Sequence, residues 1–258
     1  MADTLELHLI GIGTGNPDHL TLAAIQALNR ADLILLPRKG EDKADLADLR
    51  RDICARVLSA PVRVVEFDLP VRAADADYLA AVADWHDAIA AEWRRQIAAH
   101  LPAGTGRVAL MVWGDPALYD SSLRIAGRLG RAALAPRVHV VPGITSVQAL
   151  TAAHAIPLND LAAPVLITTG RRLRERGWPT DADTVVVMLD GNCAYRALDP
   201  YGLHIWWGAH LGMPHQTLIE GSLEAVGGEI VRQRALLRAR HGWIMDVYLL
   251  RRGAATPG

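Results

Sequence analysis

Titratable side chains follow a strongly apolar run in the middle of the chain. Asp115, Tyr119 and Asp120 come shortly after residues 108–113, and His19 stands in a similar polar stretch after an earlier apolar run. An imidazole, a phenol or a carboxyl group on a loop can act as a general acid or base on a bound substrate. We therefore take His19, Tyr119 and Asp120 as candidate catalytic residues. The alternative that each caps a helix or binds a substrate passively stays open.

The apolar run predicts the element that positions this loop. Residues 108–113 are continuously apolar, which is typical of a strand buried on both faces. Gly114-Asp115-Pro116 then ends the strand, because Gly permits positive φ, Asp bonds neighbouring amides and Pro fixes φ. Ser121 and Ser122 are candidate N-caps for a helix that begins near Leu123. The loop thus lies at the carboxyl end of a buried strand, where open parallel α/β sheets bind ligands.

The first part of the chain alternates predicted strands with predicted helices. Apolar runs predict strands at 5–12, 32–36 (stopped by Pro37), 62–67, 108–113 and 138–141. Helices are predicted near 18–29, 38–60, 77–100, 123–134 and 146–154. In the longest of them Trp85, Ile89, Trp93 and Ile97 recur every four residues, which indicates core packing. The alternation predicts a mostly parallel sheet covered on both faces.

The pattern changes after residues 155–164, which hold two prolines, Asn and Asp between periodic stretches. Beyond this boundary, strands are predicted at 165–169, 184–189, 203–207, 216–220 and 243–250, with one substantial helix at 223–240. Several strands with few crossover helices predict a mixed or antiparallel sheet. We therefore expect an α/β protein with an N-terminal domain at 1–155, a C-terminal domain at 156–252 and a disordered tail at 253–258.

The composition is that of an ordinary globular protein. The 258 residues carry a net charge of −1, so no bulk field favours nucleic acid. No apolar run is long enough for a bilayer, and the acidic start lacks the basic and apolar regions of a signal peptide. Cys54 and Cys193 stand far apart, and the ten His lack ligand spacing. We therefore expect a reduced, cytoplasmic setting and no metal site.

The first glycine-rich stretch, 11–17, invites comparison with the fingerprint of Rossmann oxidoreductases. That fingerprint requires a third glycine at residue 16, which is Asn, and an acidic residue closing the second strand, which ends at Leu36-Pro37. We therefore reject this class of enzyme. Taken alone, the stretch is also consistent with a plain glycine-rich turn from strand to helix.

Several short motifs, taken in order, resemble those of the tetrapyrrole methylases. In the first half they are 11–17 with Leu20-Thr21, 114–116 and 141–146. In the second half, 184–190 is similar to the family's central C-terminal strand, and 207–214 to its glycine-alanine-basic-leucine-glycine segment. The resemblance covers nearly the whole chain. It implies a two-domain α/β methyltransferase that uses S-adenosylmethionine and forms a homodimer.

One branch of this family is matched more closely than its sisters. The marks are Trp85-His86 with Trp93, and the stretches 112–121, 167–173 and 242–252. His19 also fits this branch, since the sisters usually carry Leu there. The resemblance implies methylation of precorrin-5 at C1 with loss of the C20 acetyl group as acetate. A methylase of the same fold acting at another precorrin carbon or on a different substrate is the alternative. A non-catalytic binding protein is disfavoured by the intact Gly114-Asp115-Pro116 loop.

The resemblance also implies cofactor contacts, made largely by main chain at loops. The residues carried over are Thr14, Gly114, Asp115, Leu118, Thr145, Ser146, Met188, Leu189 and Ala209. Core packing alone is the alternative for Leu118, Met188 and Leu189. Asp115 and Thr145 are polar residues at the ends of buried strands, which favours a functional role for this pair.

Deacetylation requires a general base and donors for the oxyanion, and His19, Tyr119 and Asp120 are the candidates. Because precorrins carry several carboxylates, Arg124, Arg171, Arg172 and Arg174 are candidate substrate clamps. The run 171–176 is nevertheless also typical of a solvated loop.

Asp246 and Gln216 are polar residues at two notable positions in the second half of the chain. Asp246 lies in an apolar strand, where a catalytic acid is conceivable but a buried carboxylate bonded by backbone amides is expected. Gln216 stands where the resemblance leads us to expect an acidic residue after Met213-Pro214. If that side chain meets the substrate, one contact differs from the family pattern.

Overall fold

The computed structural model describes residues 4–38, 44–72, 78–130 and 135–253. The chain divides into two compact units, Met1–Thr145 and Ser146–Gly258. This division lies ahead of the boundary expected at 155–164. The reason is helix α5 (Ser146–Ala153), which packs on strands β8 and β10 of the second unit. Most of the expected tail lies outside the described residues, and the Gly253 amide donates to Gly202 O at 3.1 Å.

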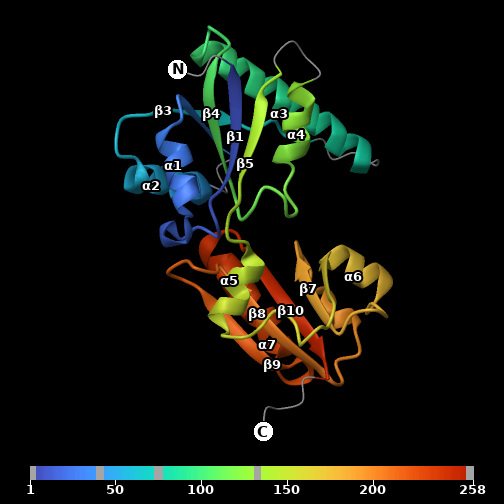
Figure 1. Cartoon of the computed structure of the whole chain (residues 1–258). Coiled ribbons are helices and arrows are strands. Elements are labelled where there is room, and N and C mark those ends of the chain that lie inside the picture. The colour runs from blue at the N-terminus through green and yellow to red at the C-terminus, as the bar shows by residue number, and fades with distance from the viewer. Residues whose placement is uncertain (1–3, 39–43, 73–77, 131–134, 254–258) are drawn as a thin grey trace. The chain divides into compact units, whose positions relative to one another are not determined.

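The first unit is built on a five-stranded sheet that is parallel throughout its described strands (Figure 1). Its order is β3-β2-β4-β1-β5. The strands are β1 (Leu5–Gly11), β2 (Leu33–Arg38), β3 (Arg63–Asp68), β4 (Gly106–Val112) and β5 (Arg137–Val141). The predicted parallel sheet is therefore confirmed. Buried apolar side chains on both faces explain why β2 and β4 hold long apolar runs, whereas β1 carries the half-buried Glu6 and His8 between its leucines.

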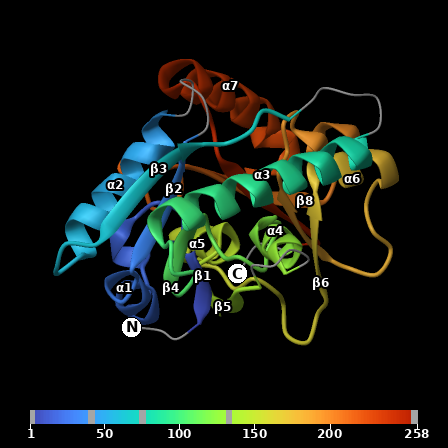
Figure 2. The same cartoon turned by 90° about the horizontal axis from the view of Figure 1, so that it is seen from above.

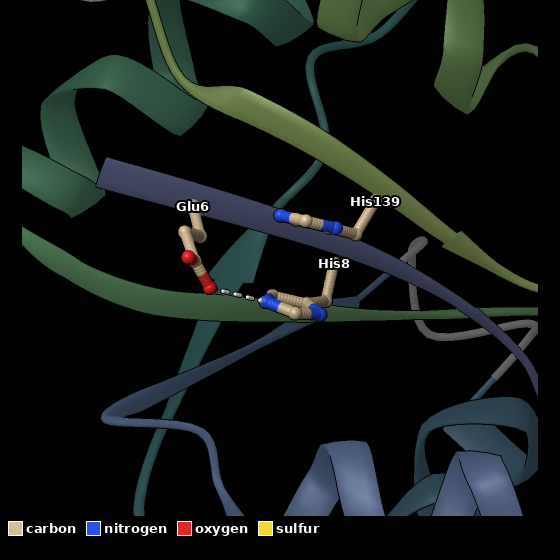
Figure 3. Close-up of side chains that lie close together, drawn as sticks. All are labelled: Glu6, His8 and His139. Atoms are coloured by element: carbon tan, nitrogen blue, oxygen red, sulfur yellow. Dashed lines mark hydrogen bonds and ion pairs between the residues drawn. The ribbon is translucent and has the colours of Figure 1, made fainter. Parts of the chain in front are cut away.

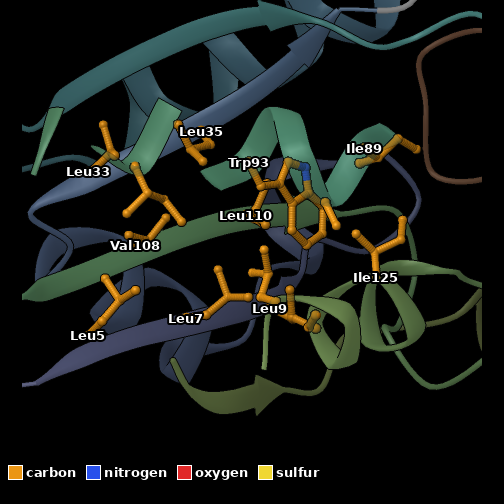
Figure 4. Packing of buried hydrophobic residues seen from close by; sticks show 14 of the residues in the cluster. Leu5, Leu7, Leu9, Leu33, Leu35, Ile89, Trp93, Val108, Leu110 and Ile125 are labelled. Carbon is orange, nitrogen blue, oxygen red and sulfur yellow. The ribbon is translucent and has the colours of Figure 1, made fainter. Parts of the chain in front are cut away.

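Helices cover both faces of this sheet. Leu5, Leu7 and Leu9 of β1 face a core closed by α3 (Tyr78–His100) and α4 (Ser122–Leu129) (Figure 4). The opposite face packs on α1 (Leu22–Asn29) and α2 (Ala44–Val57). The four-residue stripe on α3 is core as predicted, with Ile89, Trp93 and Ile97 buried and Trp85 packed against the same cluster.

Some boundaries in this unit differ from the predictions. Pro37 does not stop β2, because it lies beyond the part of β2 that pairs with β4 and so costs no ladder bond there. The first predicted helix is instead a short 3-10 turn, η1 (Pro17–His19), followed by α1, whose N-cap Thr21 accepts from the Ala24 amide. Helix α4 ends at Leu129, and residues 131–134 lie outside the described residues.

The second unit holds a mixed sheet in the order β6-β7-β10-β8-β9, as predicted. Strand β10 (Asp246–Arg252) is antiparallel to β7 (Thr184–Met188) and β8 (Leu203–Ala209). Strand β6 (Val165–Thr169) is parallel to β7, and β9 (Thr217–Ser222) is antiparallel to β8. Helix α7 (Leu223–His241) packs on β8 and β9. Figure 2 gives a second view of the same elements.

The arginine run after β6 is a helix, α6 (Gly170–Arg176), and not a loop, although its arginine side chains are exposed as the solvated alternative implied. Thr169 caps this helix by accepting from the Arg172 amide, and Leu173 anchors it in the core. A short 3-10 turn, η3 (Ala194–Ala197), follows β7. None of the described helices is long and apolar enough to cross a membrane.

Candidate active site

The loops after β1, β4 and β5 meet at the carboxyl edge of the parallel sheet, where these strands are neighbours. Gly13 and Gly114 join the first two loops through a small antiparallel bridge. The Gly114 amide donates to Gly13 O at 2.8 Å, and the Gly13 amide donates to Gly114 O at 3.3 Å. Both glycines have positive φ, 71° and 61°, which most other residues adopt only under strain.

The third loop is packed against the other two at backbone distance. A Cβ on Gly143 would lie 2.2 Å from Gly114 O and 2.7 Å from the Gly11 carbonyl carbon. A Cβ on Gly11 would lie 2.6 Å from the Gly143 amide nitrogen. Thr145 is also close, since its Cα lies 3.9 Å from the place of a Gly114 Cβ. Only glycine permits this approach, so the loops form one compact backbone surface.

The carboxylate of Asp115 holds this surface together. Its Oδ2 accepts from the Gly143 amide at 2.9 Å, and its Oδ1 accepts from the Ala117 amide at 2.7 Å. The Leu118 amide donates to Asp115 O at 3.2 Å, which closes a turn. Asp115 therefore fixes both its own loop and the loop after β5.

Polar atoms near this edge are buried without a hydrogen-bond partner among the described residues. They include Thr14 Oγ1, His19 Nδ1 and Trp113 Nε1. His19 ends η1 and lies against Gly13, whose Cβ would meet His19 Cβ at 3.3 Å. Buried polar groups usually have a partner, and leaving one unpaired costs about 1–3 kcal/mol. These atoms therefore fit a ligand that would satisfy them.

The other catalytic candidates lie in the loop after β4. Tyr119 is 44% exposed and has a φ of 50°, a strained value for an aromatic residue. Asp120 Oδ1 accepts from the Ser122 amide at 2.6 Å, whereas Ser121, at the N-cap position of α4, makes no side-chain cap. The expected serine cap is thus replaced by Asp120. Arg124 of α4 donates to Asp120 O at 2.8 Å.

A buried cation under this loop was missed by the sequence analysis. Arg50 of α2 is 8% exposed, lies 4.9 Å from the Trp113 ring centre and donates to Met111 O at 3.3 Å. Burial lowers the pKa of Arg50 to about 10, and the charge of Asp120 opposes that change. Arg50 lies in a charged helical segment, so only the packing of α2 against the sheet reveals it.

In the second unit, β7 and β8 run in the same direction because both are antiparallel to β10. Met188 and Ala209 end these strands at one edge of that sheet, and Ser146 is the first residue of α5. Leu189 is 67% exposed with a φ of 52°, so it is not a core residue. Strained, exposed positions of this kind often belong to ligand sites.

His210 follows Ala209 with a φ of 50° and is 1% exposed. Its ring lies 4.4 Å from that of His215, 5.3 Å from that of His241 and 4.8 Å from that of Trp243. Burial first, and then the charges of His215 and His241, lower the pKa of His210 to about 4. At neutral pH the basic position of this loop is therefore uncharged.

Asp246 has a structural environment of side chains rather than backbone amides. Its Oδ2 accepts from Trp207 Nε1 at 2.9 Å and from Arg234 Nε at 2.8 Å. Arg234 also donates to the carbonyl oxygens of Gly191 and Asp190. The expectation that backbone amides bond Asp246 is thus wrong, and the carboxylate belongs to a buried ion pair.

The candidate arginine clamps of the second unit lie on α6. Arg174 donates to the buried carboxylate of Asp190 at 3.2 Å, and Arg171 pairs with Glu175 at 2.9 Å. Arg172 is exposed. Gln216 Oε1 accepts from the Gly212 amide at 2.7 Å, which closes the loop after β8. A carboxylate could accept the same bond, so the substitution preserves this contact.

The parallel sheet with its three glycine loops, followed by a mixed sheet, defines a class of protein. The chain belongs to the tetrapyrrole (corrin/porphyrin) methylase family, whose model matches residues 6–227. It is 49% identical over 250 residues to the precorrin-6A synthase [deacetylating] of Sinorhizobium sp, which covers 95% of each chain.

Solved structures show the same fold. The cobalamin synthesis related protein (CobF) of Corynebacterium diphtheriae is 38% identical with a TM-score of 0.82, covering 96% of this chain and 99% of that chain. The uroporphyrin-III C-methyl transferase of Thermus thermophilus, complexed with S-adenosylhomocysteine, is 20% identical with a TM-score of 0.60. That likeness covers 95% of this chain and 92% of that chain.

Proposed function

We propose that this chain transfers a methyl group from S-adenosylmethionine to C1 of precorrin-5 and removes the acetyl group as acetate, giving precorrin-6A. The observation that carries the proposal is the 49% identity to a precorrin-6A synthase [deacetylating] over 95% of both chains. The intact glycine loops support an active enzyme rather than a scaffold that retains only the fold.

The cofactor fits the chemistry of the loops. In the first unit Thr14, Gly114, Asp115, Leu118 and Thr145 would hold it, and the unpartnered Thr14 Oγ1 supplies a polar atom that a bound nucleoside or amino-acid group can satisfy. Ser146, Met188, Leu189 and Ala209, which the family resemblance also implies as cofactor contacts, stay predictions. Support also comes from the related uroporphyrin-III C-methyl transferase, which was solved with S-adenosylhomocysteine.

S-Adenosylmethionine supplies a methyl group on a sulfonium cation, and the protein's part is to align and shield it. A rigid glycine surface held by Asp115 costs little reorganisation when the cofactor binds. Backbone groups on this surface are fixed in direction, so they can orient the cofactor while occupying little space. Burying the reacting atoms there would also exclude water from the methyl group.

Deacetylation requires that water attack the acetyl carbonyl. We propose His19 and Tyr119 for this step ahead of Asp120, because the Asp120 carboxylate already caps α4 at 2.6 Å. His19 has a buried Nδ1 without a hydrogen-bond partner, and Tyr119 holds its strained φ of 50° on the same side of the sheet edge. An imidazole suits the general base, and a phenol suits a donor to the developing oxyanion.

The several carboxylates of a precorrin require cationic partners. Arg124 and Arg172 are exposed and are proposed as substrate clamps, together with Arg171 and Arg174. The ion pairs of Arg171 with Glu175 and of Arg174 with Asp190 would have to loosen for these two to take part. We add Arg50 as a buried cation whose charge stabilises the loop that carries Asp120.

Release of S-adenosylhomocysteine from separate incubations with precorrin-5 and precorrin-2 tests the proposal. We expect turnover with precorrin-5 to exceed that with precorrin-2 by at least about 100-fold, since one well-placed polar group can discriminate by this amount. Faster turnover with precorrin-2 would support the alternative that the chain methylates another precorrin carbon. If neither precorrin is methylated, the proposal that the substrate is a precorrin is contradicted.

We also propose that the chain is a cytoplasmic homodimer. Light scattering tests the dimer.

A further inference from the structure

The register of the parallel sheet brings three potential metal ligands together. Strand β1 carries Glu6 and His8 on one face, and His8 pairs directly with His139 of the edge strand β5. Their ligand atoms all lie within 4.8 Å of one another. Figure 3 shows both imidazole rings and the carboxylate gathered on the same side of β1. No metal site was predicted from the sequence, because the spacing of these residues along the chain hides this pairing.

The arrangement is partly preorganised. His8 Nε2 lies 3.0 Å from Glu6 Oε2, and the rings of His8 and His139 stack with centroids 4.7 Å apart. His139 Nε2 is buried without a hydrogen-bond partner. The side chains of His8 and Glu6 are 19% and 23% exposed, so a small ion can reach them. This ring nitrogen lies beside an imidazole and a carboxylate, so the three side chains can donate to one metal ion.

We propose that Glu6, His8 and His139 bind a divalent first-row transition-metal ion, with Zn²⁺ as the probe. Two imidazoles and one carboxylate form a donor set that suits such ions, whereas Mg²⁺ and Ca²⁺ prefer all-oxygen sites. Ligand atoms around tetrahedral zinc lie about 3.3 Å apart, since each bond is about 2.0–2.2 Å long. The His8–Glu6 pair already meets this spacing, and a rotation of the His139 ring would bring in the third ligand.

The surrounding charges set the selectivity of this site. Arg107 of β4 is the register partner of Glu6, and its positive charge opposes the binding of a cation. That charge is partly balanced by Asp32, whose Oδ2 lies 3.9 Å from Arg107 Nε. Arg137 of β5 is the register partner of Glu6 on the other side of β1. Because these charges weaken purely ionic attraction, binding depends on the imidazoles.

The site lies away from the glycine loops. His8 precedes Gly11 by about 10 Å along the strand, at about 3.3 Å a residue. A bound ion would connect the edge strand β5, which leads into Gly143, to its neighbour β1. Its effect is therefore on stability, and the inference does not rest on the proposed methyl transfer.

Titration of the untagged, chelator-treated full chain with Zn²⁺ by calorimetry, and with Co²⁺ by visible absorption, tests the inference. We expect one equivalent of Zn²⁺, a rise in Tm on binding, and no response to Mg²⁺. His8→Gln and His139→Gln should each weaken binding by about 10-fold or more. Circular dichroism checks their folding, and Glu6→Gln is the second variant should either fail to fold. His100→Gln, at the end of α3 in the same unit, is the matched control.

Unchanged Zn²⁺ binding in the His8 and His139 variants would overturn the inference, as would no binding by the unmutated chain. Loss of binding in His241→Gln would also overturn it, since that result assigns the ion to the histidine cluster of the second unit. Methyl transfer by the metal-free chain is measured alongside, so failure of the metal site and failure of the proposed function are distinguished.

Discussion

The carboxylate of Asp115 accepts a hydrogen bond from the Gly143 amide at 2.9 Å and so ties the loop after β4 to the loop after β5. The second carboxylate oxygen accepts from the Ala117 amide at 2.7 Å. One side chain thus fixes the two loops that the proposed cofactor site needs. Because its bonds go to backbone amides, Asp115 determines the shape of the site without having to touch the reacting atoms.

Asp115→Asn should weaken binding of S-adenosylhomocysteine by about 10- to 100-fold, because a charge-assisted hydrogen bond contributes about 1.5–3 kcal/mol. In this variant the side-chain NH₂ group would face one of the backbone N–H groups that now donate to the carboxylate. Calorimetry measures the affinity, and Asp87→Asn, in an exposed ion pair with Arg128, is the control. Equal affinities for Asp115→Asn and the unmutated chain would show that the loops do not depend on this carboxylate.

Gly143→Ala should abolish cofactor binding and lower Tm, because its Cβ would lie 2.2 Å from Gly114 O and the backbone would have to move. Gly127→Ala on the exposed face of α4 is the matched control, since nothing lies within 4 Å of its Cβ position. That change should raise stability by about 0.5–1 kcal/mol through helix propensity. Tm and S-adenosylhomocysteine affinity are measured for both. Retention of both by Gly143→Ala would contradict the packing described for these loops.

The depressed pKa of His210 predicts acid sensitivity. The unfolded chain protonates this residue near its ordinary pKa of 6.5, whereas the folded chain does so only near 4. Stability from the neutral form is therefore present above pH 6.5 and falls as the pH drops from 6.5 to 4, by at most roughly 3 kcal/mol. His210→Gln should flatten this part of the profile of unfolding free energy against pH, and His100→Gln should not. Parallel profiles for the two variants would refute the assignment.

Arg234→Met should lower the free energy of unfolding by about 3–5 kcal/mol, because it leaves the buried carboxylate of Asp246 without its cation. Adding Asp246→Asn to this variant should recover part of the loss. Arg171→Met removes an exposed pair with Glu175 and should cost less than about 1 kcal/mol. Urea unfolding measures all of these. A small loss for Arg234→Met would mean that Asp246 is solvated or catalytic rather than structural.

Patterns along the chain were sufficient to predict the parallel sheet, the mixed sheet and the loops of the site. The continuous apolar run of β4 and the Gly114-Asp115-Pro116 turn are local signals, and the structure has both where the sequence predicted them. The core stripe of α3 was equally visible, because helical spacing is read within a single element.

Features that depend on register or on partners from distant segments were not predictable. His8 and His139 become neighbours only when β1 pairs with β5, and Asp246 finds Trp207 and Arg234 only after the second sheet forms. The helical conformation of α6 was not predictable either, because it depends on a cap by Thr169 and a buried anchor, Leu173, rather than on a periodic apolar face.

The most direct measurement is mass spectrometry of precorrin-5 incubated with the purified chain and S-adenosylmethionine in ¹⁸O-labelled water. We expect a tetrapyrrole that has gained one methyl group and lost the acetyl group, together with S-adenosylhomocysteine and acetate carrying one ¹⁸O atom. A methylated product that keeps its acetyl group would contradict the deacetylation step and the roles proposed for His19 and Tyr119. Unchanged precorrin-5 would contradict the proposed function itself.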